Sequence, residues 1–120
     1  MISAVVVSCN EGHLLDRCLA SLSFCDEIVV VDLQSTDNTK EIALKHNANY
    51  ILKDRVPVVE MVHTWVQDKT KHDWILITDP DEVCNSTLAT DLINVANSDD
   101  GTVGSVRVPW RFYFGKHLLR

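Results

Sequence analysis

The stretch SAVVVS, residues 3–8, decides the fold class, because it is short and rich in β-branched residues and shows no alternation of apolar and polar side chains. Consecutive apolar positions are typical of a strand buried on both faces, as in a parallel sheet covered by helices. The stretch EIVVVDL, residues 27–33, has the same character. The sequence therefore predicts a buried parallel sheet that begins close to the N-terminus.

Apolar residues at helical spacing alternate with extended runs along the rest of the chain. The expected elements after the first strand are a helix over 14–22, the strand 27–33, a helix through 42–44, a short strand 49–53, a helix over 58–66, the strand 74–78, a helix over 88–95 and an extended stretch 103–115. This order predicts one α/β domain over residues 1–120, with three α/β/α layers and a mostly parallel sheet.

Two helix starts carry capping residues. Asn38, with Glu41 three residues later, resembles a capping box, and Ser86 is expected to cap the helix that follows it. The helix over 14–22 includes Cys18, which we expect to be a small core residue.

Composition and charge exclude several classes of partner. The chain has 120 residues and a formal net charge of −6, which argues against nucleic acid or an anionic membrane surface as the main partner. No apolar run approaches the roughly 20 residues of a membrane span, and the N-terminal residues lack a signal-peptide pattern. The four cysteines form no C-x-x-C pair, which fits a reduced, cytoplasmic location.

Polar clusters follow three of the expected strands. They are Asn10 with Glu11, residues 32–37, and residues 79–82. Ligands of parallel α/β sheets lie beyond the carboxyl ends of the strands. We therefore expect the three clusters to meet at one rim of the sheet.

The third cluster belongs to the stretch WILITDPDEV, residues 74–83, where a buried strand runs directly into carboxylates. Asp81, with Asp79, is a candidate ligand pair for Mg²⁺ or Mn²⁺, because these ions take one or two protein carboxylates and complete their shell with phosphate and water. The alternative is a polar strand end that caps the next helix, and a D-x-D pattern by itself is weak. The position of the pattern at a strand end favours the metal.

The other polar residues allow two interpretations each. Asp32 follows a buried strand and is expected to accept hydrogen bonds from a ligand, whereas Ser35 and Asp37 are expected to shape the loop. Glu11 either contacts the ligand or favours the positive end of the next helix. The aromatic residues of 110–114 could line a ligand cleft, but a place in a core or in a partner interface is favoured.

Several enzyme classes lack support. The sequence has no P-loop, no G-x-G-x-x-G dinucleotide motif and no G-x-S-x-G elbow. Two further α/β classes fit the sequence less well. A nucleotidyltransferase is disfavoured because the loop CNEGHLLDR at 9–17 is acidic and has a single glycine. A phosphate-receiver domain is disfavoured because the expected strand 49–53 lacks a terminal aspartate.

The stretches SAVVVSCNEGHLLDRCLASL, DEIVVVDLQSTDNTKEIA and DWILITDPDEV together resemble the N-terminal half of the family 2 inverting glycosyltransferases. The resemblance covers nearly the whole chain and is nearest to bacterial enzymes of lipopolysaccharide core and envelope glycan synthesis. It implies the Rossmann-like GT-A fold and transfer of a sugar, with inversion, from a nucleoside-diphosphate sugar, most commonly a UDP-sugar, to a glycan or lipid-linked acceptor.

The resemblance also implies roles for single residues. The donor-binding residues would be Ser8, Asn10, Glu11, Asp32 and Asp79, with Asp32 at the nucleobase. Asp81, supported by Asp79, would hold Mg²⁺ or Mn²⁺ at the diphosphate. The metal would stabilise the departing nucleoside diphosphate.

Two departures from the family pattern follow. Many relatives carry a basic residue and an asparagine where this chain has His63 and Thr64. An inverting transfer also needs a general base; the catalytic residue is unknown here, because the acceptor-binding part that carries it in the family lies beyond the end of this sequence. We expect a partial domain, truncated after the metal-binding strand region.

The alternative function is a non-catalytic nucleotide-sugar-binding module, or one that depends on a partner for the acceptor half and the base. Apolar surface around residues 110–119 is expected to be covered, and self-association is one way to cover it. Within the family, the full-length protein would work at the cytoplasmic face of the membrane as a peripheral protein.

Overall fold

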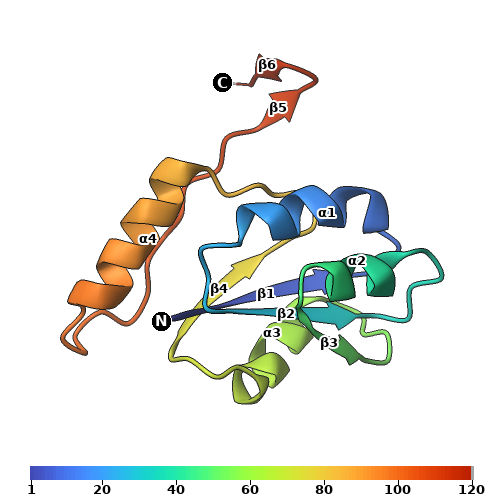
Figure 1. Cartoon of the computed structure of the whole chain (residues 1–120), viewed down its shortest axis with the longest axis horizontal. Helices are drawn as coiled ribbons and strands as arrows, with labels where there is room; N and C mark the ends of the chain where they lie inside the picture. The colour runs from blue at the N-terminus through green and yellow to red at the C-terminus, as the bar shows by residue number, and fades with distance from the viewer. Residues whose placement is uncertain (120) are drawn as a thin grey trace.

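The computed structural model describes residues 1–119 and contains a four-stranded parallel sheet with helices on both faces (Figure 1). The strands are β1 (Ile2–Ser8), β2 (Glu27–Asp32), β3 (Asn49–Leu52) and β4 (Trp74–Thr78), in the spatial order β3-β2-β1-β4. β1 is central and pairs in parallel with both β2 and β4. The predicted α/β class with a parallel sheet is confirmed.

Alternate residues of the central strand feed two separate cores. Ala4 and Val6 pack in a cluster with α1 (Gly12–Ser21) and α2 (Thr39–Lys45). Val5 and Val7 point to the opposite face and pack in a cluster with α3 (Glu60–Val66). Because both faces of β1 are covered, every position of the strand is buried, as its unbroken apolar sequence predicted.

The core cluster under α1 includes Cys18, whose side chain is fully buried. The expectation that this cysteine is a core residue is confirmed. Burial, together with the charges of Glu82, Asp79 and Asp81, raises the pKa of its thiol to about 12. A thiol in this environment stays protonated at neutral pH and is a poor nucleophile.

The expected cap at Asn38 was right in position but not in its hydrogen bond, and the expected cap at Ser86 was wrong by one residue. Asn38 lies at the N-cap of α2 without a side-chain cap, and the Asp37 Oδ1 accepts the Thr39 N–H instead, at 3.0 Å. In α4 (Ser86–Ser98) the cap is Asn85, whose side chain accepts the Leu88 N–H at 2.8 Å, so Ser86 is already helical. In each case the preceding residue has a side-chain oxygen in reach, and sequence patterns locate helix ends only within a residue or two.

The expectation of a fifth strand over residues 103–115 was also wrong. Within the described residues, 103–112 pair with no sheet, and β5 (Tyr113–Phe114) pairs only with β6 (His117–Leu118). Gly115, with φ 59°, allows the chain to fold back into this small antiparallel hairpin. β4 therefore remains an edge strand, and the hairpin projects beyond the body of the molecule (Figure 1).

The remaining described segments are short. The one-turn helix η1 (Gln67–Lys69) follows α3 and leads towards β4. No helix among residues 1–119 has the length and hydropathy required to cross a bilayer.

At the amino ends of the strands a buried carboxylate joins three segments. The Glu27 Oε2 accepts the Ser3 hydroxyl at 2.6 Å and the Lys71 N–H at 2.8 Å. The Ser3 hydroxyl oxygen in turn accepts the His72 N–H at 3.3 Å. Burial tends to raise the pKa of Glu27, but the hydrogen bonds from Ser3 and Lys71 and the Lys71 charge outweigh it, so the pKa is lowered.

We expect Glu27→Ala to lower the free energy of unfolding by about 1–3 kcal/mol, because it leaves the Lys71 N–H and the Ser3 hydroxyl without their acceptor. Since the folded-state pKa is lowered, this contribution is present above the unfolded pKa of about 4.3 and is lost as the pH falls through the folded value. Urea denaturation at neutral and acidic pH measures both effects. The exposed Asp91→Ala is the control, and equal stability of the two variants would contradict the role given to Glu27.

Candidate functional site

The loops that follow β1 and β2 are joined by hydrogen bonds from one to the other. The Asn10 N–H donates to the Ser35 hydroxyl at 2.8 Å, and the Thr36 N–H donates to the Asn10 Oδ1 at 2.8 Å. The Gly12 N–H donates to the Asp37 Oδ2 at 2.8 Å. Two of the three predicted polar clusters therefore meet at the carboxyl edge of the sheet, and Ser35 and Asp37 shape the loop as expected.

Two features of the sequence make this close approach feasible. Asn10 has φ 55°, in the left-handed region that asparagine tolerates better than most residues. A Cβ at position 12 would collide with the Asn38 side chain and come within 2.9 Å of the Asp37 Oδ2, so glycine is required there to leave the hydrogen bond in place. The side chain of Asn10 thus holds the loop through its Oδ1.

Asp32 lies opposite Ser8 in the parallel register and is 2% exposed. Its Oδ1 accepts the Ser35 N–H at 2.8 Å, and its Oδ2 accepts the Tyr50 hydroxyl at 2.6 Å. Burial, together with the hydrogen bond to Asp32 and its charge, raises the pKa of Tyr50 to about 12. The carboxylate is therefore held rigidly, and because each of its oxygens has a second lone pair, it can still accept from a ligand.

Ser8 ends β1 and is 1% exposed. Its hydroxyl oxygen is a buried polar atom without a hydrogen-bond partner among the described residues. An unpartnered buried hydroxyl is costly unless a ligand or water completes it. Ser8 thus lies at the predicted position, beside Asp32, with an unused hydroxyl.

The carboxylates after β4 are presented by a tight turn. The Glu82 N–H donates to the Asp79 carbonyl at 3.0 Å, with Pro80 buried at the second position, where turns favour proline. The Glu82 Oε2 accepts the Asp79 N–H at 2.9 Å and the Thr78 hydroxyl at 2.8 Å. Glu82 therefore closes the turn, and the side chains of Asp79 and Asp81 are exposed.

We call Glu11, Asp79 and Asp81 the acidic rim. Burial raises the pKa of Glu11, and the charges of Asp81 and Asp79 raise it further against the opposing effect of His13. Partial desolvation by the surrounding turn likewise raises the pKa of Asp79 although its side chain reaches solvent, with further increases from Glu82 and Asp81. The third polar cluster therefore lies close to the first, and the like charges of the two oppose each other.

Glu11 occupies the N-cap position of α1 but makes no side-chain cap. This position fits both interpretations, because a carboxylate at the start of a helix also interacts favourably with its positive end without capping it. His63 of α3 lowers the pKa of Asp79, so this helix also approaches the rim. The His63 Nε2 is buried and has no hydrogen-bond partner in the described part of the chain.

The carboxylates of the rim fit a metal that is shared with a ligand. No group of three His, Cys, Asp or Glu side chains among residues 1–119 could hold an ion by itself. Mg²⁺ and Mn²⁺ need only one or two protein carboxylates when phosphate oxygens supply other ligands. Raised carboxylate pKa values at a partly exposed rim are the pattern expected where a cation is to be received.

Two cavities lie away from the rim. One, of about 370 Å³, is at the amino edge of the sheet beside Asp26, Glu27 and Lys71. The other, of about 380 Å³, lies between β4 and α4 and includes Trp74 and Leu92 in its walls. Both are open hollows, and neither includes a residue of the acidic rim.

The sequence did not single out Tyr50 as a partner of Asp32, because the two side chains are 18 residues apart and meet only through the pairing of β2 with β3. His63 was noted only as a departure from the family pattern. The structure places it near Asp79.

A family model described as glycosyl transferase family 2 matches residues 3–117. The chain belongs to this family. A protein of Rickettsia bellii described as an uncharacterized glycosyltransferase is 33% identical over 92 residues, which cover 76% of this chain. A lipopolysaccharide core biosynthesis glycosyltransferase of Rhizobium meliloti is 27% identical over 98% of this chain. The chain spans 31% of the first relative and 43% of the second.

The same fold occurs in glucosyl-3-phosphoglycerate synthase of Mycobacterium tuberculosis, whose crystal structure contains Mn²⁺, UDP and glucosyl-3-phosphoglycerate. The TM-score is 0.65 at 23% identity, over 84% of this chain and 41% of that one. At this identity the likeness shows the fold, which is the GT-A fold that the resemblance implied.

Replacing Asp79 by Asn should raise the free energy of unfolding at pH 7 by up to about 1 kcal/mol, because it removes one of the mutually repelling charges. The gain should shrink as the pH falls, because the raised pKa lets Asp79 take up a proton in the unmodified protein. Thermal and urea denaturation without nucleotide or metal measure the difference. Asp91→Asn on α4 is the matched control, and an Asp79→Asn variant less stable than the unmodified chain would show that repulsion at the rim is unimportant.

Proposed function

We propose that this chain is the donor-binding part of an inverting glycosyltransferase. It would bind a nucleoside-diphosphate sugar, with UDP as the favoured nucleotide, together with Mg²⁺ or Mn²⁺ at the acidic rim. The sugar would pass to a glycan or lipid-linked acceptor. The observation that carries the proposal is the approach of Glu11 to Asp79 and Asp81, three carboxylates that raise one another's pKa values or lie beside those that do, and that form no ion pair within the described residues.

The chain's own residues have distinct tasks in this proposal. Asp79 and Asp81 present oxygen ligands from a turn that Pro80 and Glu82 hold in one conformation. A rigid turn matters because the ligand geometry is then set before the donor arrives. The metal, when bound, would neutralise the charge that develops on the departing diphosphate.

Asp32 and Ser8 form the part of the site nearest the sheet. Asp32 is oriented by Ser35 and Tyr50, so its free lone pairs have a defined direction for the N–H of a nucleobase. The unpartnered hydroxyl of Ser8 can complete its hydrogen bonding with the same ligand. Asn10 contributes in another way, since its Oδ1 holds the two loops together and its exposed amide NH₂ is free for the donor.

The relatives support this class of donor and suggest the setting. The Mycobacterium tuberculosis synthase of the same fold was crystallised with UDP-glucose and Mn²⁺ as well as with UDP and Mg²⁺. The Rhizobium meliloti relative is described as a lipopolysaccharide core enzyme. We accordingly propose a role in bacterial envelope glycan synthesis, at the cytoplasmic side where nucleotide sugars are made.

Calorimetric titration with UDP, with and without Mn²⁺, tests the proposal. Saturable binding should require Mn²⁺, and Asp81→Asn should weaken it by about 10- to 100-fold, the effect of losing one charge-assisted ligand contact. Asp91→Asn, which removes the same charge far from the rim, should leave the affinity unchanged.

Acid should also weaken the binding, because protons compete with the cation for Glu11 and Asp79, whose pKa values are raised. The affinity should therefore begin to fall at a higher pH than the ordinary carboxylate pKa values would give. Failure of the folded protein to bind UDP at any Mn²⁺ concentration would overturn the donor-site assignment. Equal affinities of the Asp81→Asn and Asp91→Asn variants for UDP would rule out Asp81 as a metal ligand.

A further inference from the structure

Tyr50 of β3 gives the Asp32 carboxylate its shorter hydrogen bond. The Tyr50 hydroxyl donates to the Asp32 Oδ2 at 2.6 Å, and the Ser35 N–H donates to the Oδ1 at 2.8 Å. Each oxygen of this carboxylate therefore has one fixed donor, and Asp32 as a whole is 2% exposed. An ionised carboxylate carries no hydrogen, so Asp32 can offer a ligand only acceptor lone pairs.

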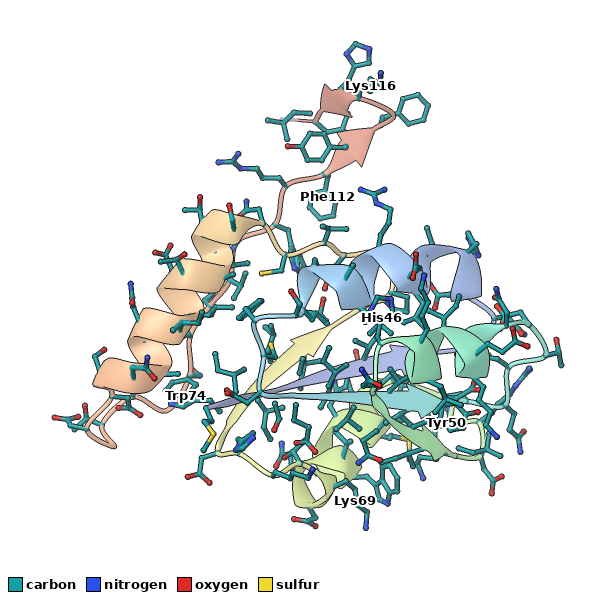
Figure 2. The ribbon with its side chains drawn as sticks, viewed as in Figure 1. His46, Tyr50, Lys69, Trp74, Phe112 and Lys116 are labelled. Atoms are coloured by element: carbon teal, nitrogen blue, oxygen red, sulfur yellow. The ribbon has the colours of Figure 1, made fainter. Side chains whose placement is uncertain are left out.

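The position of the Tyr50 ring is set by the sheet and by α2. Tyr50 lies opposite Val30 of β2, and side chains two residues apart in a strand point to one face, so the ring and Asp32 share a face of the sheet. The ring packs against the core cluster under α1 and α2, and the Lys40 Nζ lies 5.4 Å from its centroid. Figure 2 shows Tyr50 beside α2. The hydroxyl is thus presented to Asp32 from the packed part of the fold, which restricts its movement.

The Tyr50 hydroxyl keeps its proton at neutral pH. Its pKa is raised to about 12 by burial, by the hydrogen bond to Asp32 and by the Asp32 charge. Since its hydrogen is directed at Asp32, the hydroxyl has only lone pairs left for a ligand. Asp32 and Tyr50 together therefore form a pair that accepts hydrogen bonds from a ligand and donates none.

We propose that Tyr50 is a positioning residue that makes the donor site select uracil over cytosine. The two bases have the same shape and differ only at N3 and at the group on C4. Uracil has an N–H at N3 that can donate to Asp32, whereas the N3 of cytosine would turn a lone pair towards the carboxylate. Two acceptors placed against each other in a buried site lose a hydrogen bond and repel. This selection rests on the proposed function, because it requires Asp32 to face the base.

The orientation of the carboxylate matters because cytosine also has a donor, the amino group on C4. A carboxylate that is free to turn can meet this amino group in place of an N3–H. Rotation of the Asp32 carboxylate would break the hydrogen bonds from Ser35 and Tyr50. Of these two restraints, the one from Tyr50 depends on a single hydroxyl, and phenylalanine would fill the same space without it. Loss of that hydroxyl should therefore reduce the selection between the bases and spare the diphosphate end of the site.

Calorimetric titrations of the full chain in Mn²⁺ test the proposal, with UDP, CDP and inorganic pyrophosphate as the ligands. The unmodified protein should bind UDP about 10- to 100-fold more tightly than CDP, the effect of one hydrogen bond to a charged group. Tyr50→Phe should weaken UDP binding about three- to tenfold and reduce the preference for UDP over CDP by at least about the same factor. It should leave the affinity for pyrophosphate unchanged, because pyrophosphate has no base.

Tyr113→Phe is the matched control. It removes a hydroxyl from a tyrosine that is 58% exposed and belongs to the hairpin of β5 and β6. This variant should keep the affinities for all three ligands. Melting temperatures of the two variants measure any loss of stability separately, and a purely structural role of Tyr50 would lower the melting temperature without changing the ratio of UDP to CDP affinities.

Three outcomes would contradict the role of Tyr50. Equal binding of UDP and CDP by the unmodified protein would show that Asp32 and Tyr50 do not distinguish the bases. An unchanged preference in Tyr50→Phe would show that the hydroxyl does not orient the carboxylate for the base. Equal losses of UDP and pyrophosphate affinity would show that Tyr50 supports the site as a whole. Failure of the proposed function differs from all three, because the unmodified protein would then bind neither UDP nor pyrophosphate, and the base selection would fail with it.

Discussion

The parallel pairing of β1 with both of its neighbours is the constraint on which the rest of the structure depends. It aligns Ser8 with Asp32 and Val6 with Thr78, so that the loops after β1, β2 and β4 leave the sheet at one edge. Hydrogen bonds then join the first two loops, and the turn after β4 brings its carboxylates towards Glu11. The site follows from this register, since a strand shifted by one residue would turn its side chains to the opposite face.

The carboxylates proposed to bind the cation also destabilise the unliganded fold. Burial and like charge raise the pKa values of Glu11 and Asp79, so the folded protein bears an electrostatic cost at neutral pH. The amino edge of the sheet shows the reverse, because Glu27 is compensated by Ser3 and Lys71 and its pKa is lowered. The carboxylate that supports the fold and the carboxylates proposed to receive a cation thus differ in their hydrogen bonds.

Local patterns were sufficient for the main elements and for the rim. The unbroken apolar runs of β1 and β2 identify strands buried on both faces, and parallel strands then bring their carboxyl ends together. What the sequence could not supply depends on contacts between distant residues, such as the hydrogen bond from the Tyr50 hydroxyl to Asp32. Residues 103–115 have strand composition, yet the turn at Gly115 pairs the end of this stretch with residues 117–118 and leaves β4 at the edge.

The central claim is that the acidic rim receives a metal ion together with a diphosphate, and a crystal structure of the chain with UDP and Mn²⁺ tests it most directly. Anomalous scattering locates the manganese independently of the protein model. The peak should lie within roughly 2.0–2.6 Å of a carboxylate oxygen of Asp81, with the diphosphate on its other side and the uracil towards Asp32. A peak away from the rim, or UDP in the cavity beside Glu27 and Lys71, would contradict the assignment.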